Sequence, residues 1–152
     1  MRFMDAEIIS VGTEIVLGQI VNTNAAYLAK RLTQLDLPAT YQTTVDDQSQ
    51  RLERVINHAL TRAQLVFVCG GLGPTADDVT MPTVAKALGK ELCTDEEHWK
   101  WIQKTFEQRQ IKMEPENVRQ AQYPRGGEPL ANPVGLALGC WYETKGKVVV
   151  VL

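Results

Sequence analysis

Few of the features that mark secreted or membrane proteins occur in this sequence. Cysteine is scarce: Cys69, Cys93 and Cys140 are odd in number, far apart and outside any C-x-x-C spacing, which argues against a disulfide framework and a thiolate zinc site. There is no long apolar stretch, and acidic residues follow the first methionine closely, which argues against a signal peptide and a membrane span. We therefore predict a reducing, cytoplasmic setting without a membrane partner.

Basic clusters are also missing. Sixteen lysine and arginine residues balance eighteen acidic ones, and no run of them could supply the phosphate contacts that a duplex-binding surface needs. Nucleic acid is therefore not an expected partner. The chain has 152 residues, of which 44% are hydrophobic, and this is enough for one domain with a buried core. We predict a single domain over residues 1–152.

Apolar runs alternate with helical periods along the first 89 residues. Strands are predicted at 6–12, 39–45 and 65–69, and helices at 24–37, 52–60 and 79–88. Asn24 is the expected N-cap of the first helix, and Asp47 or Ser49 that of the second. The repeated order of strand and helix is typical of an α/β domain with a mostly parallel sheet.

The remaining sequence is less regular. An apolar stripe predicts a helix at about 95–110, and the Pro- and Gly-rich segment 113–139 is predicted to be irregular. Two short strands, around Trp141 and over 146–152, are expected to form a hairpin at the edge of the sheet, joined by the turn "ETKGK". Because the final run "GKVVVVL" is typical of an interior strand that leads into a loop, we expect the sequence to be a piece of a longer protein.

Two glycine-bearing segments follow predicted strands. "VGTEIVLGQIVNTN" comes after the first strand and "GGLGPTADDVT" after the third, so both should face one crevice at the carboxyl ends of the strands. Glycines let backbone N–H groups approach a phosphate, and a helix that begins near Asp78 or Thr80 would offer its positive end. Asp77 and Asp78 would repel phosphate unless a divalent cation such as Mg²⁺ lies between them.

Purely structural readings of the same residues remain open. Asp77 or Asp78 could simply cap the third helix, the glycines could only make the turn, and Thr13 and Glu14 could be turn residues. The glycine segment matches neither the Walker loop nor the dinucleotide fingerprint G-x-G-x-x-G.

Four segments together carry a family resemblance. "GTEIVLGQIVNTNAAYLA", "GGLGPTADDVT", "ENVRQAQYP" and "ANPVG" occur in the order, and at about the spacings, of the CinA (competence/damage-inducible) family. The chain resembles the N-terminal domain of that family, which is similar to the molybdopterin-binding fold of molybdenum cofactor biosynthesis proteins. The resemblance implies a three-layer α/β/α sandwich with a mixed, mostly parallel sheet. Departures from the family pattern are Leu136 and Leu138 in place of threonine and proline, and Asp36 in place of glycine.

The resemblance also implies an activity, metal-dependent hydrolysis of ADP-ribose to AMP and ribose 5-phosphate. Many family members carry a second domain that hydrolyses the amide of nicotinamide mononucleotide. The expected cofactor is a divalent cation, Mg²⁺ or similar, with K⁺ as a further candidate, and the expected assembly is a homodimer. Asp77 and Asp78 would hold the metal, with Asp46 or Glu14 as a further ligand or as the base that positions water. The expected substrate-binding residues are Gly12, Thr13, Glu14, Asn24, Gly70, Gly71, Gly73, Pro74, Thr75 and Thr80.

Two alternatives remain from the sequence. The first is a molybdopterin-binding or adenylyl-transferring protein; against it, the pairs Pro74-Thr75 and Asp77-Asp78 follow the CinA pattern, and the cofactor-inserting branch tends to carry arginine at the place of Asp77. The second is a non-catalytic module that dimerises or supports a neighbouring domain.

Overall fold

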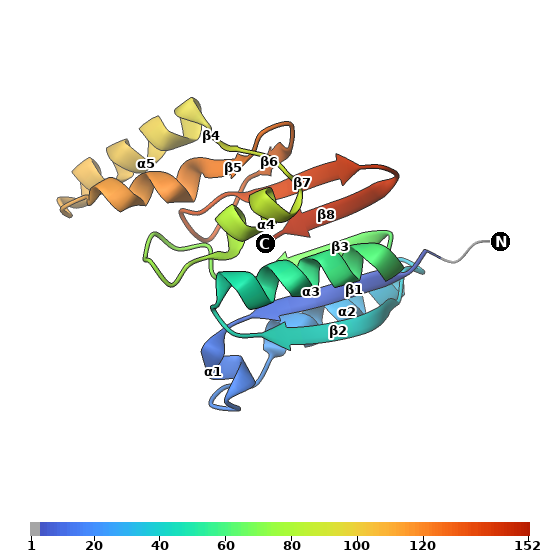
Figure 1. Cartoon of the computed structure of the whole chain (residues 1–152). Helices are drawn as coiled ribbons and strands as arrows, with labels where there is room; N and C mark the ends of the chain where they lie inside the picture. Colours follow the sequence, from blue (N-terminus) through green and yellow to red (C-terminus); the bar gives the residue numbers. More distant parts are fainter. Residues whose placement is uncertain (1–3) are drawn as a thin grey trace.

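A six-stranded sheet organises the computed structural model, which describes residues 4–152 (Figure 1). The strand order is β2-β1-β3-β8-β7-β6. The pairs β1–β2, β1–β3 and β3–β8 are parallel, whereas β7 pairs antiparallel with both β8 and β6. The strands are β1 (Ala6–Val11), β2 (Ala39–Val45), β3 (Leu65–Cys69), β6 (Glu128–Leu130), β7 (Gly139–Thr144) and β8 (Lys147–Val151). The predicted α/β fold with a mostly parallel, mixed sheet is therefore confirmed.

Helices cover both faces of the sheet because side chains of β1 alternate between two cores. Ile9 and Val11 belong to the core on the side of α3 (Ser49–Arg62) and α4 (Thr80–Ala87). Ala6 and Ile8 belong to the core that includes α2 (Thr23–Gln34). The result is the predicted arrangement of three layers, with α2 and α3 on opposite sides of β1 (Figure 1). Within residues 4–152, no helix has the length and apolarity needed to cross a membrane.

The predicted helix caps were wrong. Asn22, not Asn24, caps α2: its side-chain oxygen accepts a hydrogen bond from the backbone N–H of Ala25 at 3.1 Å. Helix α3 has Gln48 at its N-cap and no side-chain cap, because the Asp47 carboxylate accepts hydrogen bonds from elsewhere. Several side chains near the start of each helix could have capped it. Contacts with other parts of the fold decided which of them does so.

The ends of two helices explain residues that depart from simple expectations. Asp36 follows α2 with φ 57°, a left-handed conformation that aspartate tolerates better than most residues, so an aspartate can stand where the resemblance predicts glycine. Helix α4 begins at Thr80 without a side-chain cap, so neither Asp77 nor Asp78 serves as the cap that the structural reading proposed.

The segment predicted to be irregular is partly ordered. Helix α5 (Glu96–Arg109) forms as predicted and buries Ile102. After it, a 3₁₀ helix η1 (Pro115–Ala121) begins with a capping box between Glu114 and Asn117. Strand β5 (Gln122–Pro124) then pairs antiparallel with β4 (Leu92–Thr94) in a small second sheet. The prediction failed here because three-residue strands are too short to show a period.

The final hairpin was predicted correctly, but its place in the sheet was not. Strands β7 and β8 are joined at Lys145 and Gly146, both with positive φ, as a two-residue hairpin turn requires. Strand β8 lies between β3 and β7, and the edge is formed by β6. The interior position agrees with the continuous apolar run of β8, since such strands are buried on both faces.

Candidate functional site

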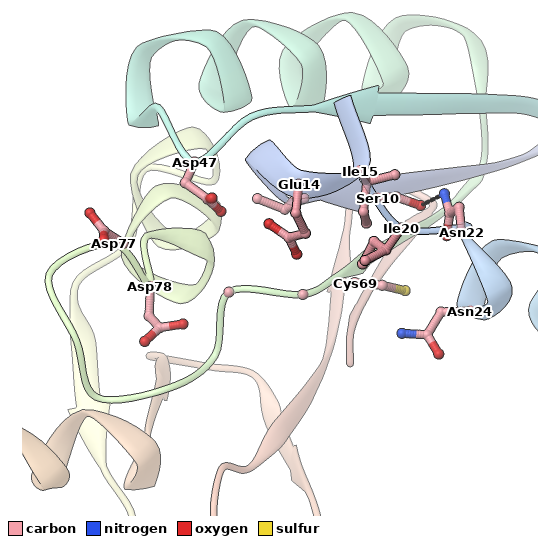
Figure 2. A pocket seen from close by; sticks show the side chains of 13 residues that line it. Ser10, Glu14, Ile15, Ile20, Asn22, Asn24, Asp47, Cys69, Asp77 and Asp78 are labelled. Atoms are coloured by element: carbon pink, nitrogen blue, oxygen red, sulfur yellow. Dashed lines mark hydrogen bonds between the residues drawn. The ribbon is translucent and has the colours of Figure 1, made fainter. Parts of the chain in front are cut away.

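A cavity of about 270 Å³ lies at the carboxyl ends of β1 and β3 (Figure 2). Its lining residues are Ser10, Val11, Glu14, Ile15, Ile20, Asn22, Asn24, Asp47, Cys69, Gly70, Gly71, Asp77 and Asp78. Both glycine-bearing segments contribute to this lining, so the prediction that they face one crevice is confirmed. The place agrees with the general rule for ligand sites in open α/β sheets.

The turn that leaves β3 can be made only by glycine. Gly70 has φ 99°, and a Cβ on it would collide with the backbone carbonyl oxygen of Val11 in β1. Gly71 has φ 67°, and a Cβ there would lie 2.6 Å from Oγ1 of Thr80. Because these two residues have no side chain, the backbone can pass close to the end of β1. The wall of the cavity is therefore formed here by main-chain atoms.

The loop after β1 is tied to its neighbours by short polar side chains. Thr13 donates from its backbone N–H and from Oγ1 to Oδ2 of Asp47, each at 3.0 Å. Asn22 donates from Nδ2 to Oγ of Ser10 at 2.8 Å (Figure 2). Thr13 begins the short helix α1 (Thr13–Val16). These contacts fix α1 against the loop after β2 and the start of α2 against β1.

The loop after β3 is held from within and from a distant element. Within it, Oδ2 of Asp78 accepts hydrogen bonds from the backbone N–H of Thr75 at 2.9 Å and from its hydroxyl at 2.6 Å. From η1, the Arg119 guanidinium donates to the carbonyl oxygens of Thr75 at 2.7 Å, Asp78 at 3.0 Å and Pro74 at 3.4 Å. The fixed fork of an arginine suits several acceptors at once, so Arg119 clamps the loop that carries Asp77 and Asp78.

The cavity is acidic. Glu14, Asp47, Asp77 and Asp78 line it, and none of its lining residues is lysine or arginine. Figure 2 shows the carboxylates of Asp77 and Asp78 pointing in different directions, while the side chain of Asp47 points toward Glu14. Among residues 4–152 there is no group of three or more histidine, cysteine, aspartate or glutamate side chains placed to hold a metal ion. In proteins a hard cation such as Mg²⁺ needs only one or two carboxylates, with its other positions filled by water and phosphate oxygens, and the carboxylates here that could hold one are those of Glu14, Asp47, Asp77 and Asp78.

Six of the predicted site residues line the cavity: Glu14, Asn24, Gly70, Gly71, Asp77 and Asp78. Seven lie outside its lining: Gly12, Thr13, Asp46, Gly73, Pro74, Thr75 and Thr80. Thr75 supports Asp78, and Thr13 supports Asp47. Thr80 is fully buried, and its hydroxyl has no hydrogen-bond partner, so it acts as packing beneath Gly71.

Asp46, predicted as a metal ligand or as the base, lies outside the lining of the cavity. Its carboxylate pairs with Arg51, and this hydrogen-bonded guanidinium holds the pKa of Asp46 below its usual value. Asp47 lines the cavity instead. The sequence showed two adjacent carboxylates after β2, and only the position of the strand end could decide which of them faces the crevice.

The sequence reasoning also missed residues that line or support the cavity. Ser10, Asn22 and Asp47 line the cavity, and Arg119 clamps its loop. Alternation along β1 could have placed Ser10 near the strand end, and Arg119 stands inside the segment "ENVRQAQYP" that carried the resemblance. Cys69 is buried at the end of β3, and burial raises the pKa of its thiol to about 11, so it lines the cavity as a neutral group.

Comparison with known proteins identifies the family. The sequence model of the family described as "Probable molybdopterin binding domain" matches residues 7–152. A competence-damage inducible protein of Limosilactobacillus reuteri (strain DSM 20016) is 96% identical over 149 residues, which are 98% of this chain and 36% of that protein. The chain belongs to the molybdopterin-binding domain family and, within it, to the CinA proteins.

Further relatives agree with this assignment. A competence-damage inducible protein of Limosilactobacillus fermentum is 53% identical over 98% of this chain and 36% of its own length. The solved structure of CinA from Thermoplasma acidophilum has a TM-score of 0.89 and 36% identity, covering 97% of this chain and 86% of that one. The molybdopterin biosynthesis enzyme MoaB from Thermus thermophilus shares the fold, with a TM-score of 0.62 and 13% identity over 98% of this chain and 80% of its own. The chain spans about a third of the length of the two competence-damage inducible proteins.

Proposed function

We propose that the cavity binds a nucleotide diphosphate through a divalent cation and hydrolyses ADP-ribose to AMP and ribose 5-phosphate. The observation that carries the proposal is that a glycine turn and four carboxylates line the same cavity. Glycine backbone at a strand end is suited to approach phosphate groups. Carboxylates at the same place repel phosphate unless a cation lies between them, so the two features together favour a metal-bridged phosphate ligand.

The residues of the chain would act as follows. Gly70 and Gly71 would bring main chain close to the diphosphate. Asp77 and Asp78 would hold the cation, which requires the side chain of Asp77 to turn from the direction seen in Figure 2. When bound, Mg²⁺ supplies neutralisation of phosphate charge and polarisation of a phosphoryl oxygen. Glu14 or Asp47 would accept a proton from the attacking water as its oxygen bonds to one phosphorus. The bridging P–O bond breaks, and its oxygen leaves as a phosphate oxygen of the other product.

The contacts that hold the loop support this role for Asp78. Two hydrogen bonds from Thr75 orient one carboxylate oxygen, Oδ2, while Arg119 binds the flanking carbonyl oxygens. Groups that are fixed before the reaction need no reorganisation when charge develops, and such fixed groups stabilise transition states most effectively. The arrangement therefore favours a catalytic loop over a simple turn.

The experiment that tests the proposal measures AMP release from ADP-ribose by chromatography, with Mg²⁺ and with a chelator. We expect AMP only with the metal, and a loss of roughly 10²- to 10³-fold in turnover for Asp78→Asn. Asn keeps an oxygen that can accept from Thr75 but removes the charge. Comparison of Asp47→Asn with Asp46→Asn tests which of the two neighbouring carboxylates takes part in the reaction. Only Asp47→Asn should lower turnover. Equal AMP release in chelator, or an unaltered rate for Asp78→Asn, would refute the proposal.

A second candidate function is molybdopterin binding, which the family description and the likeness to MoaB favour. Titration of a molybdopterin precursor into the same protein distinguishes the two. Binding of the precursor without hydrolysis of ADP-ribose would support this candidate. Failure to bind either ligand would favour the non-catalytic module.

A further inference from the structure

The two edges of the main sheet differ in how well they are protected against pairing with another strand. Strand β6 forms one edge and has only three residues, which include Glu128 and Pro129. Strand β2 forms the other edge with seven residues, none of which is charged or proline. Short length, charge and proline are the usual protection of a sheet edge. The β2 edge therefore lacks the protection that the β6 edge has.

The outer side of β2 is open along the regular part of the strand. Its register with β1 shifts at the start of the strand and is continuous from Tyr41 to Val45. Among the strands of residues 4–152, only β1 pairs with it, and the side chains of Gln42 and Thr44 are exposed. Backbone N–H and C=O groups on the outer side of such an edge can pair with a further strand. The edge therefore fits an extended polypeptide segment.

Exposed apolar side chains lie near both ends of this edge. Helix α1 lies against β2, and Figure 1 shows it beyond the β2 edge, at the arrowhead end of the strand. The segment 15–22, here called the α1 arm, exposes Val16, Leu17, Ile20 and Val21. Leu35 is 67% exposed and comes shortly before the other end of β2. Neither the α1 arm nor β2 carries a charged residue, and scarcity of charge is typical of the centre of a protein interface.

We propose that the β2 edge pairs antiparallel with the β2 edge of a second copy of this chain. A twofold axis at Thr43, the centre of the regular part, places Gln42 of each copy opposite Thr44 of the other, and Tyr41 opposite Val45. Pairs of aromatic and β-branched residues stabilise antiparallel strands. The same axis brings the α1 arm of each copy to the end of β2 that follows Leu35 in the other. An unrelated strand would match the backbone of the edge but not the apolar groups at both ends.

These apolar groups supply surface that the strand pair lacks. A stable interface buries roughly 800 Å² on each partner, which is more than the edge of one short strand offers. The α1 arm and Leu35 enlarge the contact with apolar surface, whose burial drives association. The inference does not depend on the proposed function. It goes beyond the expected homodimer, because it names the surface, the orientation of the two copies and the side chains that meet.

Sedimentation equilibrium of the chain and its variants tests the pairing. We expect a dimer, and we expect Gln42→Lys and Thr44→Asp each to weaken association by about 10-fold or more, because each variant places like charges near one another across the axis. A mixture of the two variants should associate again, since the new lysine of one copy faces the new aspartate of the other. Gln108→Lys, the same change at an exposed position of α5, is the control and should leave the dimer intact.

The α1 arm has a test of its own. Leu17→Ser should weaken the dimer by about 10- to 100-fold, because the side chain loses the apolar surface that the second copy would cover. Ile111→Ser is the matched control: Ile111 is 55% exposed, against 64% for Leu17, and lies after α5. Circular dichroism of each variant should match that of the unchanged chain, since all the substituted side chains are exposed.

The possible results distinguish the occupants of the edge. A monomer at every concentration would overturn the proposal and leave the edge to a strand of another protein. A dimer that Gln42→Lys and Thr44→Asp do not weaken would also overturn it, because the copies would then meet at a different surface. Failure of the mixed variants to associate would contradict the antiparallel register, and equal association of Leu17→Ser and Ile111→Ser would remove the α1 arm from the interface.

Discussion

The loops after β1 and β3 form opposite walls of one cavity but are held in different ways. The loop after β1 is tied by Thr13–Asp47 and Asn22–Ser10 contacts, all from elements of the first 50 residues. The loop after β3 is clamped by Arg119, which lies 44 residues beyond Thr75. The first wall is therefore held by residues close to it in the sequence. The second wall is held only when the later part of the chain packs against it.

The two walls also carry different carboxylates. Short hydrogen bonds between neighbouring loops fix the shape of the first wall, which carries Glu14. The second wall carries Asp77 and Asp78, and a guanidinium with three carbonyl acceptors fixes it. Both walls are held by hydrogen bonds to a charged group, the Asp47 carboxylate in the first and the Arg119 guanidinium in the second, so the walls differ in where along the chain this group lies.

The largest effect is expected at Gly70, where the loop after β3 touches the end of β1. We predict that Gly70→Ala lowers the free energy of unfolding by about 2–6 kcal/mol, because the new Cβ meets the carbonyl oxygen of Val11 and the residue keeps a positive φ. Gly18 is the matched control: it has φ 70°, but a Cβ there meets nothing within 4 Å. Gly18→Ala should cost only about 1 kcal/mol. Equal losses in chemical denaturation would show that the close approach to β1 is unimportant.

Removal of Arg119 should affect only the wall formed by the loop after β3. We predict that Arg119→Ala lowers turnover of ADP-ribose by about 10- to 100-fold, because the loop that carries Asp78 loses three hydrogen bonds to a charged donor. Added guanidinium ion should restore part of the rate, a recovery that general unfolding would not allow. Arg109→Ala, at an exposed position of α5, is the control and should leave turnover unchanged. A normal rate for Arg119→Ala would mean that the loop is held without the arginine.

The sheet beneath both walls carries a buried ion pair of its own. Glu7 accepts hydrogen bonds from Arg62 at 2.8 and 2.9 Å and from Thr43 at 2.7 Å. Burial alone would raise the pKa of Glu7, but these donors and the positive charge of Arg62 outweigh it and hold the pKa below its usual value of 4.5.

The stability from Glu7 should therefore be complete above pH 4.5 and lost as the pH falls through its lower folded-state pKa. We predict that Glu7→Gln costs about 1–3 kcal/mol at neutral pH and that its difference from the unchanged protein shrinks in acid. Denaturant titrations between pH 7 and pH 3 measure this. A difference that stays constant over the range would contradict the assignment.

The smallest predicted effect concerns the support of the first wall. Asn22→Ala removes the cap of α2 and the hydrogen bond to Ser10, and should cost about 1 kcal/mol of stability. Asn24→Ala, two residues later, should change stability by less than about 0.5 kcal/mol. Thermal unfolding of the two variants distinguishes them. Equal shifts would mean that the cap had been assigned to the wrong asparagine.

Local patterns in the sequence were enough to predict the first half of the fold. Apolar runs such as 65–69 predict strands, and the helical periods of α2 and α3 predict helices. The order of the strands then brings "GTE" and "GGLG" to the same edge of the sheet. The second half was predicted less well, because η1, β4 and β5 are too short for a period and exist through pairing with each other. The direction of side chains could not be predicted from the sequence either. The sequence could not show that Asp47 and not Asp46 lines the cavity, or that Asn22 and not Asn24 caps α2.

We propose that a divalent cation lies between the carboxylates of the acidic cavity and a diphosphate. The test is to measure the affinity of ADP-ribose by calorimetry, once with Mg²⁺ and once with a chelator, at a temperature low enough to prevent turnover. We predict that the metal tightens binding of ADP-ribose by about 5- to 150-fold, the usual range of coupling between two ligands, and that Asp78→Asn removes most of this gain. Equal affinity with metal and with chelator would contradict it.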